Sequence, residues 1–419
     1  MQAVCRPFFY RFFNIERFDK ELRGLEAPYI ILANHSDWWD PFFLMLDVAE
    51  PTHFVATEDL FSLFPYGLFI GRLGAIPKVK FLPDLDTVKA LFKCRDLGRS
   101  IGIFPEGERN WDGKTLPLVP ATVKLIKKLR EPVVVVILKG AHLSFPRWAY
   151  FSRRGKIELD YRVAATKEEL GAIDADELVA RIRKAFAYDE HEWNRERRIA
   201  YRGPGRSLGI EALLYLCPNC GRADGIRGGF GGRVRCRCGF ELRLDEYGEF
   251  AAPRVAARPP LKGETIAFRD PGEWHRWEKT ALVAALDAAL EGVGETEKIA
   301  PDLLGRGAAA PGALVAERGV ALYRRQRRGG RVRLRRLMRC DLFLLADRIV
   351  FEGRGRREEF RLADIGGMNV LYRNLFDFAV GDELYRVKPR NASRSMLKFL
   401  HAARHLAQRA GSTVLSSES

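Results

Sequence analysis

The chain lacks an apolar run long enough to cross a lipid bilayer. Its uninterrupted runs resemble Val133–Leu138 in length, whereas a spanning helix needs about 20 apolar residues. The N-terminus also lacks the continuous apolar core of a signal peptide, because Arg6, Arg11, Glu16 and Arg17 interrupt its aromatic residues. We therefore expect no membrane-spanning helix, and without an export signal the expected compartment is the cytoplasm.

Acidic residues are outnumbered by basic ones, and cysteines are few. The 419 residues include 54 Asp and Glu against 70 Lys and Arg, which gives a net charge of +16. This excess favours a polyanionic partner, either an anionic membrane or a nucleic acid. The seven cysteines are an odd number, and four of them cluster within residues 217–238. In a reducing compartment this pattern indicates a metal site rather than disulfides.

The first half of the chain alternates between strand-like and helix-like segments. Apolar runs predict strands at Tyr29–Ala33, His53–Ala56, Ser100–Phe104 and Pro132–Leu138, and amphipathic runs predict helices at Asp84–Leu97 and Pro117–Leu129. Lys156–Val163 fits a further edge strand, and Asp174–Ala187, with a charged extension to Arg198, fits a closing helix. This order is typical of an α/β domain with a largely buried sheet and helices on both faces.

Composition divides the chain into four segments, as expected for this length. Residues 1–200 form the α/β domain, residues 201–250 hold the cysteine cluster, residues 251–313 contain a linker and an amphipathic helix at Glu273–Leu290, and residues 314–419 are β-rich. The last segment ends in a helix at Ser393–Ala410, an element order that faintly resembles a pleckstrin-homology domain.

The N-terminal stretch 6–18 mixes arginines with aromatic residues. Phe8, Phe9, Phe12 and Phe13 share one face of a helix. Two interpretations stay open. The helix lies on a membrane surface, with arginines at the level of the headgroups, or it packs on the core and shields the first strand.

The clearest chemical signal is the string Asn34-His35-Ser36-Asp37-Trp38-Trp39-Asp40. The strand that ends at Ala33 delivers His35 to its carboxyl end, where open α/β sheets hold their chemistry. Asp40 before Pro41 predicts a helix start, capped by Asp40, and its carboxylate can fold back onto His35. A carboxylate fixes the tautomer of an imidazole that deprotonates an alcohol. In the alternative, Asp40 only caps its helix and His35 only satisfies backbone groups.

The second string, Phe104-Pro105-Glu106-Gly107-Glu108-Arg109, turns away from a short buried strand. Gly107 lets a backbone approach a ligand closely, and Arg109 offers a guanidinium fork suited to phosphate oxygens. Glu106 either accepts a hydrogen bond from a substrate hydroxyl or holds Arg109. The alternative is a surface turn with an ordinary salt bridge. Between the two strings, a glycine-bearing loop carries three cations that suit a phosphate clamp, Arg72, Lys78 and Lys80.

With these strings in this order, residues 28–140 resemble the glycerophospholipid acyltransferase family. Four blocks of that family are matched by Asn34, His35 and Asp40, by Gly74, Ile76 and Lys80, by Phe104–Gly107 with Arg109, and by the apolar strand Pro132–Leu138. The sequence departs from the family pattern at three positions. Asp37 stands in place of a serine, Lys80 in place of an arginine, and Glu108 in place of a threonine.

The resemblance implies direct acyl transfer to a lysophospholipid. His35 would take the proton of the glycerol hydroxyl, with Asp40 as its support, and the oxygen would attack an acyl thioester. Glu106, Gly107, Arg109 and Lys80, with Lys78 or Arg72, would hold the glycerol phosphate. The donor would be acyl-CoA or acyl carrier protein, and 1-acylglycerol-3-phosphate is the expected acceptor, with another lysolipid or glycerol compound as the alternative. No catalytic cofactor is expected, and the enzyme would be peripheral on the inner face of the membrane.

The cysteine cluster has the pattern C-x₂-C and C-x-C, with fifteen residues between the two pairs. Four thiolates on two turns predict a structural zinc ribbon, since four protein ligands leave no open position for catalysis. A [4Fe–4S] cluster is the alternative. The four expected ligands are Cys217, Cys220, Cys236 and Cys238, and the remaining cysteines, Cys5, Cys94 and Cys340, fit ordinary packing positions.

Residues 322–339 carry a run of arginines around Val332, Leu334 and Leu337, which predicts a strand with one cationic face. This face would bind lipid headgroups or a carrier protein, or it is a solvated edge.

A nucleic-acid partner is not expected, because base stacking needs aromatic residues among the cations of this run and only Tyr323 lies at its edge. A non-catalytic lipid-binding scaffold is a third interpretation, which would need neither His35 nor Asp40. The arginines are Arg324, Arg325, Arg327, Arg328, Arg331, Arg333, Arg335, Arg336 and Arg339.

Overall fold

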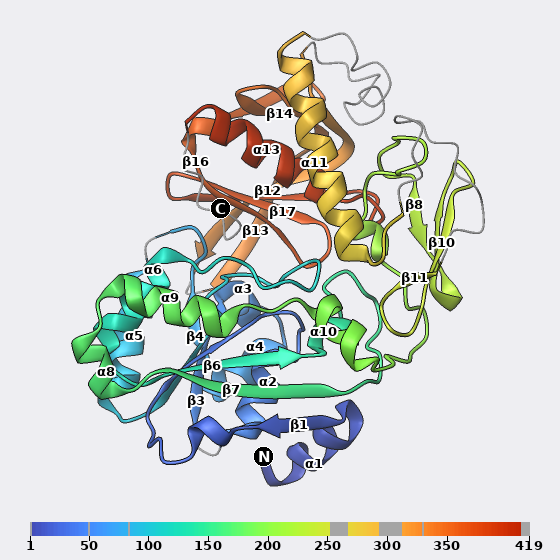
Figure 1. Ribbon diagram of the computed structural model, residues 1–419. Coiled ribbons are helices and arrows are strands. Elements are labelled where there is room, and N and C mark those ends of the chain that lie inside the picture. The colour runs from blue at the N-terminus through green and yellow to red at the C-terminus, as the bar shows by residue number, and fades with distance from the viewer. Residues whose placement is uncertain are drawn as a thin grey trace. The chain divides into compact units, whose positions relative to one another are not determined.

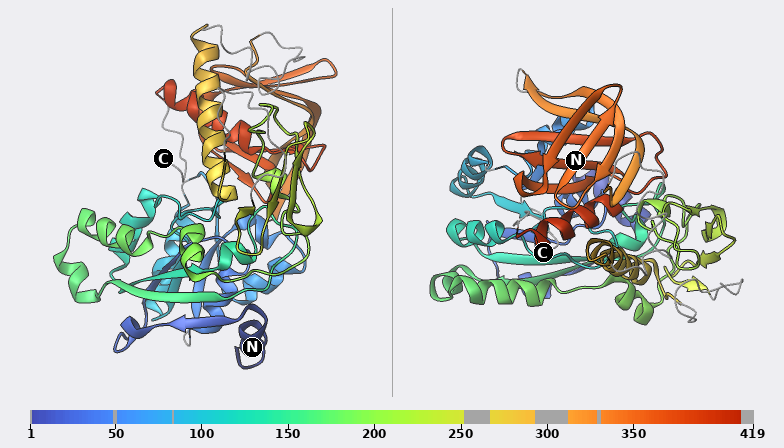
Figure 2. Two further views of the ribbon diagram at one scale, coloured as in Figure 1. Left: turned by 45° about the vertical axis from the view of Figure 1, so that its right-hand side comes forward. Right: turned by 90° about the horizontal axis from the view of Figure 1, so that it is seen from above.

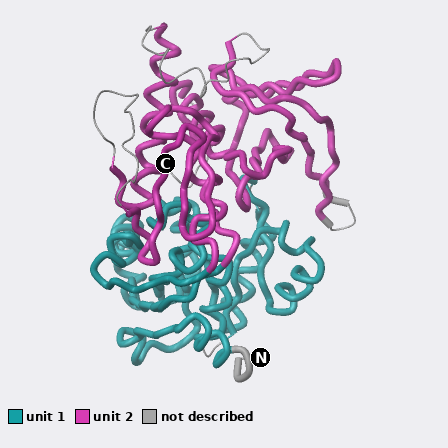
Figure 3. The backbone as a smooth tube through the Cα atoms, turned by 90° about the vertical axis from the view of Figure 1, so that its right-hand side faces the viewer, with its two compact units in different colours: residues 1–147, 152–203, 417–419 teal, residues 148–151, 204–416 magenta. Residues whose placement is uncertain are grey.

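The computed structural model describes residues 2–48, 51–82, 84–251, 267–292, 312–328 and 331–411. The chain divides into two compact units, shown in different colours in Figure 3. Unit 1 comprises residues 1–147 and 152–203, and unit 2 comprises residues 148–151 and 204–416; residues 417–419, grouped with unit 1, lie outside the described residues. Among the described residues, no helix combines the length and apolarity that a membrane span requires.

Unit 1 is built on a seven-stranded sheet with the order β1-β7-β6-β2-β5-β3-β4. Figure 1 shows β1, β7 and β6 side by side in this sheet. Neighbouring strands are parallel except for β6 and β7, which run antiparallel. The central strands are buried on both faces, which explains their continuous apolar runs. The strands are β1 (Ile15–Phe18), β2 (Ile30–Ala33), β3 (Thr52–Thr57), β4 (Ile76–Lys78), β5 (Ser100–Ile103), β6 (Val133–Lys139) and β7 (Ile157–Ala165).

Helices cover both faces of this sheet, as the sequence predicts. One core cluster joins β2, β5 and β6 to residues of α5, α6 and α9, and the other joins the opposite faces of β2 and β6 to α1 and α2. The helices of unit 1 are α1 (Gln2–Phe13), α2 (Asp40–Asp47), α3 (Glu58–Phe61), α4 (Tyr66–Arg72), α5 (Leu85–Asp96), α6 (Pro120–Leu129), α7 (Ala141–Ser144), α8 (Lys167–Ala172), α9 (Ala175–Phe186) and α10 (Glu190–Arg197).

Three expected elements differ in unit 1. The predicted edge strand is β7, which lies inside the sheet, because residues 15–18 form a strand that pairs with it, Ile15 opposite Ile157. The predicted N-terminal helix therefore ends at Phe13. The charged extension of the closing helix is a separate helix, since Asp189 accepts hydrogen bonds from the backbone N–H groups of His191 and Glu192 and starts α10.

The aromatic face of α1 mostly packs inward. Phe13 is only 3% exposed, and Phe9 and Phe12 pack against the core beside it. Phe8 alone of the four predicted residues is largely exposed. The packing interpretation therefore describes most of this helix, which shields β1 and β2.

The described part of unit 2 contains two sheets and two long helices. The small sheet has the order β11-β10-β9-β8, and the large antiparallel sheet has the order β15-β14-β13-β12-β18-β17-β16. Helices α11 (Pro271–Leu290) and α13 (Leu397–Arg409) lie side by side (Figure 2), where Asp287 accepts hydrogen bonds from His405 and Arg409. The strands are β8 (Ile226–Gly228), β9 (Arg233–Cys236), β10 (Glu241–Leu244), β11 (Phe250–Ala251), β12 (Val315–Arg328), β13 (Arg331–Leu344), β14 (Arg348–Gly353), β15 (Arg356–Arg361), β16 (Ile365–Leu371), β17 (Leu375–Val380) and β18 (Glu383–Pro389).

The C-terminal segment is β-rich and ends in a helix, as predicted, but its first two strands are not short. β12 and β13 each have 14 residues and pair along their length. Most of the predicted linker 251–270 lies outside the described residues, as does most of the loop 303–313. The finer domain limits and the pleckstrin-homology-like fold stay predictions.

Candidate active site

His35 and Asp40 lie together just beyond the carboxyl end of β2. Nδ1 of His35 is 2.9 Å from Oδ2 of Asp40. The same carboxylate oxygen accepts hydrogen bonds from the backbone N–H groups of Ser36, at 2.7 Å, and Asp37, at 2.8 Å. Asp40 is the first residue of α2 and not its cap, a position that Trp39 takes. Its carboxylate therefore points back along the chain to the turn that carries His35.

The surroundings of His35 favour the neutral imidazole. The ring stacks on Phe104 with centroids 4.1 Å apart, and 22% of the side chain is exposed. Burial lowers the pKa of His35 well below its usual value, and the nearby charges of Arg109, Lys80 and Arg147 lower it further. When Nδ1 of a neutral imidazole donates its hydrogen to a carboxylate, Nε2 is available to accept a proton.

The carboxylates around His35 are deeply buried. Burial raises the pKa of Asp40 to about 7, while the N–H groups of Asp37 and Ser36 and the charge of Arg109 act in the opposite direction. Burial and the neighbouring Asp40 raise the pKa of Asp37 well above its usual value. Ionisation of Asp40 therefore depends on the hydrogen bonds and cations that surround it.

Glu106 connects the two predicted strings. Its side chain is fully buried, and its Oε1 accepts a hydrogen bond from the backbone N–H of His35 at 2.8 Å. Its Oε2 accepts another from the backbone N–H of Leu116, also at 2.8 Å. Both carboxylate oxygens thus bind backbone groups, an arrangement that differs from the two roles considered from the sequence. Burial raises the pKa of Glu106 well above its usual value.

The turn after β5 needs a glycine. Gly107 has a φ of +73°, which side chains rarely adopt, and its N–H donates to the carbonyl of Phe104. Asn110, which follows this turn, was not singled out from the sequence. Its N–H donates to the carbonyl of His35 at 2.8 Å, and its Nδ2 donates to Oγ of Ser36 at 2.8 Å. The two strings therefore share several hydrogen bonds.

The structure brings some of the predicted cations together and leaves others apart. Arg109 and Lys80 lie close enough to His35 to lower its pKa, and the guanidinium of Arg109 lies 5.7 Å from the ring centre of Trp38. Arg72, at the end of α4, and Lys78, in β4, are exposed. Among the described residues, no hydrogen bond or ion pair joins either of them to His35, Asp40, Glu106 or Arg109.

Arg147 is a further residue that the sequence did not reveal. It lies 3.2 Å from Oε2 of Glu108, donates to the carbonyl of Arg109 at 2.5 Å, and stacks 4.2 Å from the ring centre of Trp111. Glu108 and Arg147 are both buried. The glutamate that departs from the family pattern is thus paired with a buried arginine. No local signal marks Arg147, which lies eight residues after the end of β6.

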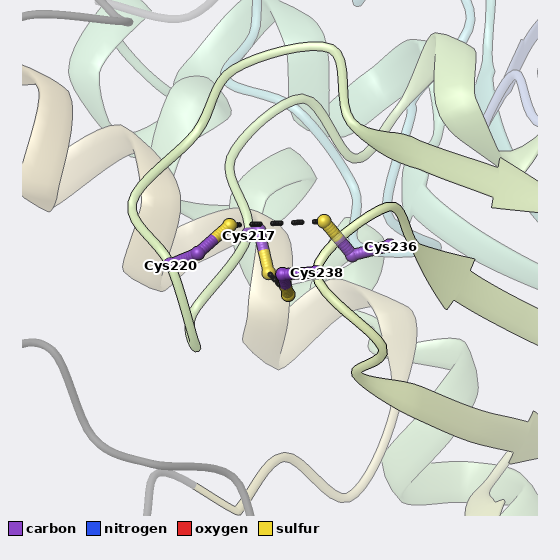
Figure 4. A group of neighbouring side chains, drawn as sticks. All are labelled: Cys217, Cys220, Cys236 and Cys238. Atoms are coloured by element: carbon purple, nitrogen blue, oxygen red, sulfur yellow. Dashed lines mark hydrogen bonds between the residues drawn. The ribbon is translucent and has the colours of Figure 1, made fainter.

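The four cysteines of unit 2 gather as the sequence predicts (Figure 4). Their sulfur atoms all lie within 4.8 Å of one another, with 3.8 Å between Cys217 and Cys238 and between Cys220 and Cys236. Zn–S bonds of about 2.3 Å in a tetrahedron place sulfur atoms about 3.8 Å apart. The side-chain amide of Asn219 also donates to the sulfur of Cys238. The donor set therefore fits a tetrahedral metal ion.

Known proteins resemble the N-terminal part of this chain. Residues 11–139 match the family model described as Acyltransferase. The chloroplastic 1-acyl-sn-glycerol-3-phosphate acyltransferase BAT2 of Brassica napus is 26% identical over 135 residues, which are 30% of this chain and 39% of that protein. The beta form of the same acyltransferase from Homo sapiens is 26% identical over 187 residues, 42% of this chain and 66% of that protein.

Among solved structures, the 1-acyl-sn-glycerophosphate acyltransferase PlsC of Thermotoga maritima covers 47% of this chain and 78% of its own, with 20% identity and a TM-score of 0.39. The chain thus spans about two fifths of the Brassica napus relative and just under two thirds of the human one. The family match falls on the segment that carries His35, Asp40, Glu106 and Arg109. Residues 11–139 of this chain therefore match the Acyltransferase family, and the relatives that the chain resembles include 1-acyl-sn-glycerol-3-phosphate acyltransferases.

Proposed function

We propose that this protein transfers an acyl group from acyl-CoA or acyl carrier protein to the hydroxyl of a lysophospholipid, with 1-acylglycerol-3-phosphate as the acceptor we favour. The observation that carries the proposal is the contact between Nδ1 of His35 and the buried carboxylate of Asp40. The relatives named 1-acyl-sn-glycerol-3-phosphate acyltransferase support this choice of acceptor.

In the proposed reaction, Nε2 of His35 takes the proton of the acceptor hydroxyl as its oxygen attacks the carbonyl carbon of the thioester. The tetrahedral intermediate collapses with cleavage of the carbon–sulfur bond, and the leaving thiolate takes the proton from the imidazolium. Asp40 stabilises the imidazolium through Nδ1 in the interval. Because the resting pKa of His35 is low, the ring is unprotonated and ready to act as a base near neutral pH.

The phosphate of the acceptor would bind to Arg109 and Lys80. Both cations lie close to His35, and a guanidinium fork suits two phosphate oxygens. Arg147 neutralises Glu108, so that this glutamate does not repel the phosphate. Gly107 and Glu106 shape and hold the loop that carries Arg109. Arg72 and Lys78 would act only if the bound acceptor extends toward β4.

In unit 2 we propose a structural zinc ribbon held by Cys217, Cys220, Cys236 and Cys238, whose sulfur spacing suits tetrahedral coordination. The metal would stabilise the two turns that carry the cysteines and would take no part in acyl transfer. The exposed arginines of β13, which include Arg333, Arg335, Arg336 and Arg339, would bind the anionic headgroups of the inner membrane face.

The test is to incubate the purified protein with labelled acyl-CoA or acyl carrier protein and a panel of lysophospholipids. We expect labelled phosphatidic acid from 1-acylglycerol-3-phosphate and its loss in Asp40→Asn. If another lysolipid gives the product, the reaction stands and the acceptor changes. If no lysolipid is acylated by either donor, the proposed function is wrong.

A further inference from the structure

One surface segment of unit 1 is unusually apolar. Residues 60–71, which include the connection between α3 and α4, contain no charged side chain, although 30% of the whole chain is charged. Within this segment Leu63, Phe64, Leu68 and Phe69 are all exposed, and Phe64 is 85% exposed. An exposed apolar cluster of this kind marks a contact with another molecule or with a membrane.

The segment packs directly against residues that flank the candidate active site. Phe69 stacks on Phe42 of α2, with ring centres 5.8 Å apart, and Tyr66 lies 5.3 Å from Trp38. The guanidinium of Arg109 in turn lies over the ring of Trp38. The exposed apolar residues are therefore connected, through one layer of aromatic rings, to the turn of His35 and to the proposed phosphate ligand.

Cations border the segment on its C-terminal side. Arg72 is exposed and lies four residues after Leu68 and three after Phe69 on the same helix, which places it on their face. Lys78, in the following strand, is exposed as well. Apolar residues beside cations fit the boundary between headgroups and acyl chains in an anionic bilayer. A second protein copy would need a matching acidic and apolar face.

We propose that Leu63, Phe64, Leu68 and Phe69, with Arg72, form the surface by which this acyltransferase docks on an anionic bilayer and receives its lipid acceptor. The proposal rests on the proposed function, and it adds a membrane contact at the α3–α4 connection to the one proposed above for the arginines of β13. Helix α1 is less suited to this role, because Phe9, Phe12 and Phe13 pack against the core. The docked segment would place the site beside the lipid whose hydroxyl reacts.

The experiment compares the full chain with the double variant Phe64→Ser and Leu68→Ser and with Phe64→Ser alone. The matched control is Leu85→Ser with Leu97→Ser, two exposed leucines at the ends of α5. Sedimentation with vesicles of phosphatidylcholine, with and without phosphatidylglycerol, measures binding. Acyl transfer is measured with long-chain acceptor in the same vesicles and with a short-chain, monomeric lysophosphatidate.

We expect the double variant to bind vesicles about tenfold more weakly or worse and to lose turnover of the embedded acceptor to a similar extent. Turnover of the monomeric acceptor and the control variant should stay within about twofold of the unaltered protein. Arg72→Gln should reduce the preference for phosphatidylglycerol in the binding assay.

Unchanged vesicle binding by the double variant would overturn the docking surface. An equal loss of vesicle binding in the control variant would also overturn it. The same holds if the unaltered protein is a dimer and the double variant is a monomer that binds vesicles as well as the dimer does. The proposed function fails separately, if the unaltered protein acylates neither acceptor. In that case binding that still depends on Phe64 and Leu68 supports the docking surface alone.

Discussion

The backbone N–H of His35 donates a 2.8 Å hydrogen bond to the carboxylate of Glu106, 71 residues later in the chain. The second oxygen of this carboxylate binds the N–H of Leu116. A buried glutamate thus ties the turn after β2 to the loop after β5. In the proposed mechanism, this contact sets the distance between the base and the phosphate ligand Arg109.

Replacing Glu106 with glutamine tests this role. The amide has one oxygen for two backbone donors, and its NH₂ group would face the other N–H. An unpaired buried donor costs about 1–3 kcal/mol, so we expect Glu106→Gln to lower the free energy of unfolding by that amount and to reduce kcat. Urea unfolding and steady-state kinetics measure both effects. Glu26→Gln, at an exposed position, is the control, and a Glu106→Gln protein that matches it would contradict the assigned role.

The pH dependence of kcat/KM should respond to Arg109. Its charge lowers the pKa of His35 and that of Asp40. The reaction needs a neutral His35 and an ionised Asp40, so activity is lost as the pH falls through these pKa values. Without the cation both pKa values rise, and Arg109→Gln should move the acid limb of kcat/KM upward by about half a unit to one unit. A limb that stays in place or moves to lower pH would contradict the proposed electrostatics.

The pair of Glu108 and Arg147 should show strong coupling in stability. Both side chains are buried and lie 3.2 Å apart. Arg147→Met leaves a buried carboxylate without its cation, which costs about 3 kcal/mol or more. Adding Glu108→Gln should recover at least about 1 kcal/mol of the loss. Denaturant unfolding of the two single variants and the double variant measures the coupling, and additive effects would show that the pair does not act as a unit.

Metal analysis and chelation test the ribbon. Under reducing conditions we expect about one zinc ion per chain and no iron. Cys217→Ser should lose the ion and lower the melting temperature of unit 2, with the rate of acyl transfer to a monomeric acceptor unchanged. Protein purified without zinc, or with stoichiometric iron and sulfide, would contradict the assignment.

The sheet of unit 1 could be predicted from the sequence because parallel strands that are buried on both faces appear as continuous apolar runs. Val133–Leu138 is a continuous apolar run, and β6 covers all of it and ends one residue later, at Lys139. The contact of His35 with Asp40 was also accessible, since Pro41 predicts a helix start and the spacing brings the carboxylate back. Residues 15–18 misled the prediction, because an aromatic and β-branched stretch suits a helix face and a strand equally.

Other features depend on tertiary contacts that no local pattern encodes. Arg147 reaches Glu108 from a loop 39 residues later, and Glu106 binds backbone groups from two loops. The sequence alone does not show that the apolar residues around Phe64 are exposed. Apolar content is the same for a core helix and a surface helix, and only the neighbouring elements of the fold decide which residues are covered. The long pairing of β12 with β13 is likewise a property of the assembled sheet.

The most direct test of the central claim is the turnover of His35→Ala with acyl-CoA and monomeric 1-acylglycerol-3-phosphate, beside unfolding and zinc content. If His35 is the base, kcat falls by at least about 10³-fold, while the free energy of unfolding and the zinc content stay close to those of the unaltered protein. A correctly folded His35→Ala protein that retains full turnover would contradict the account.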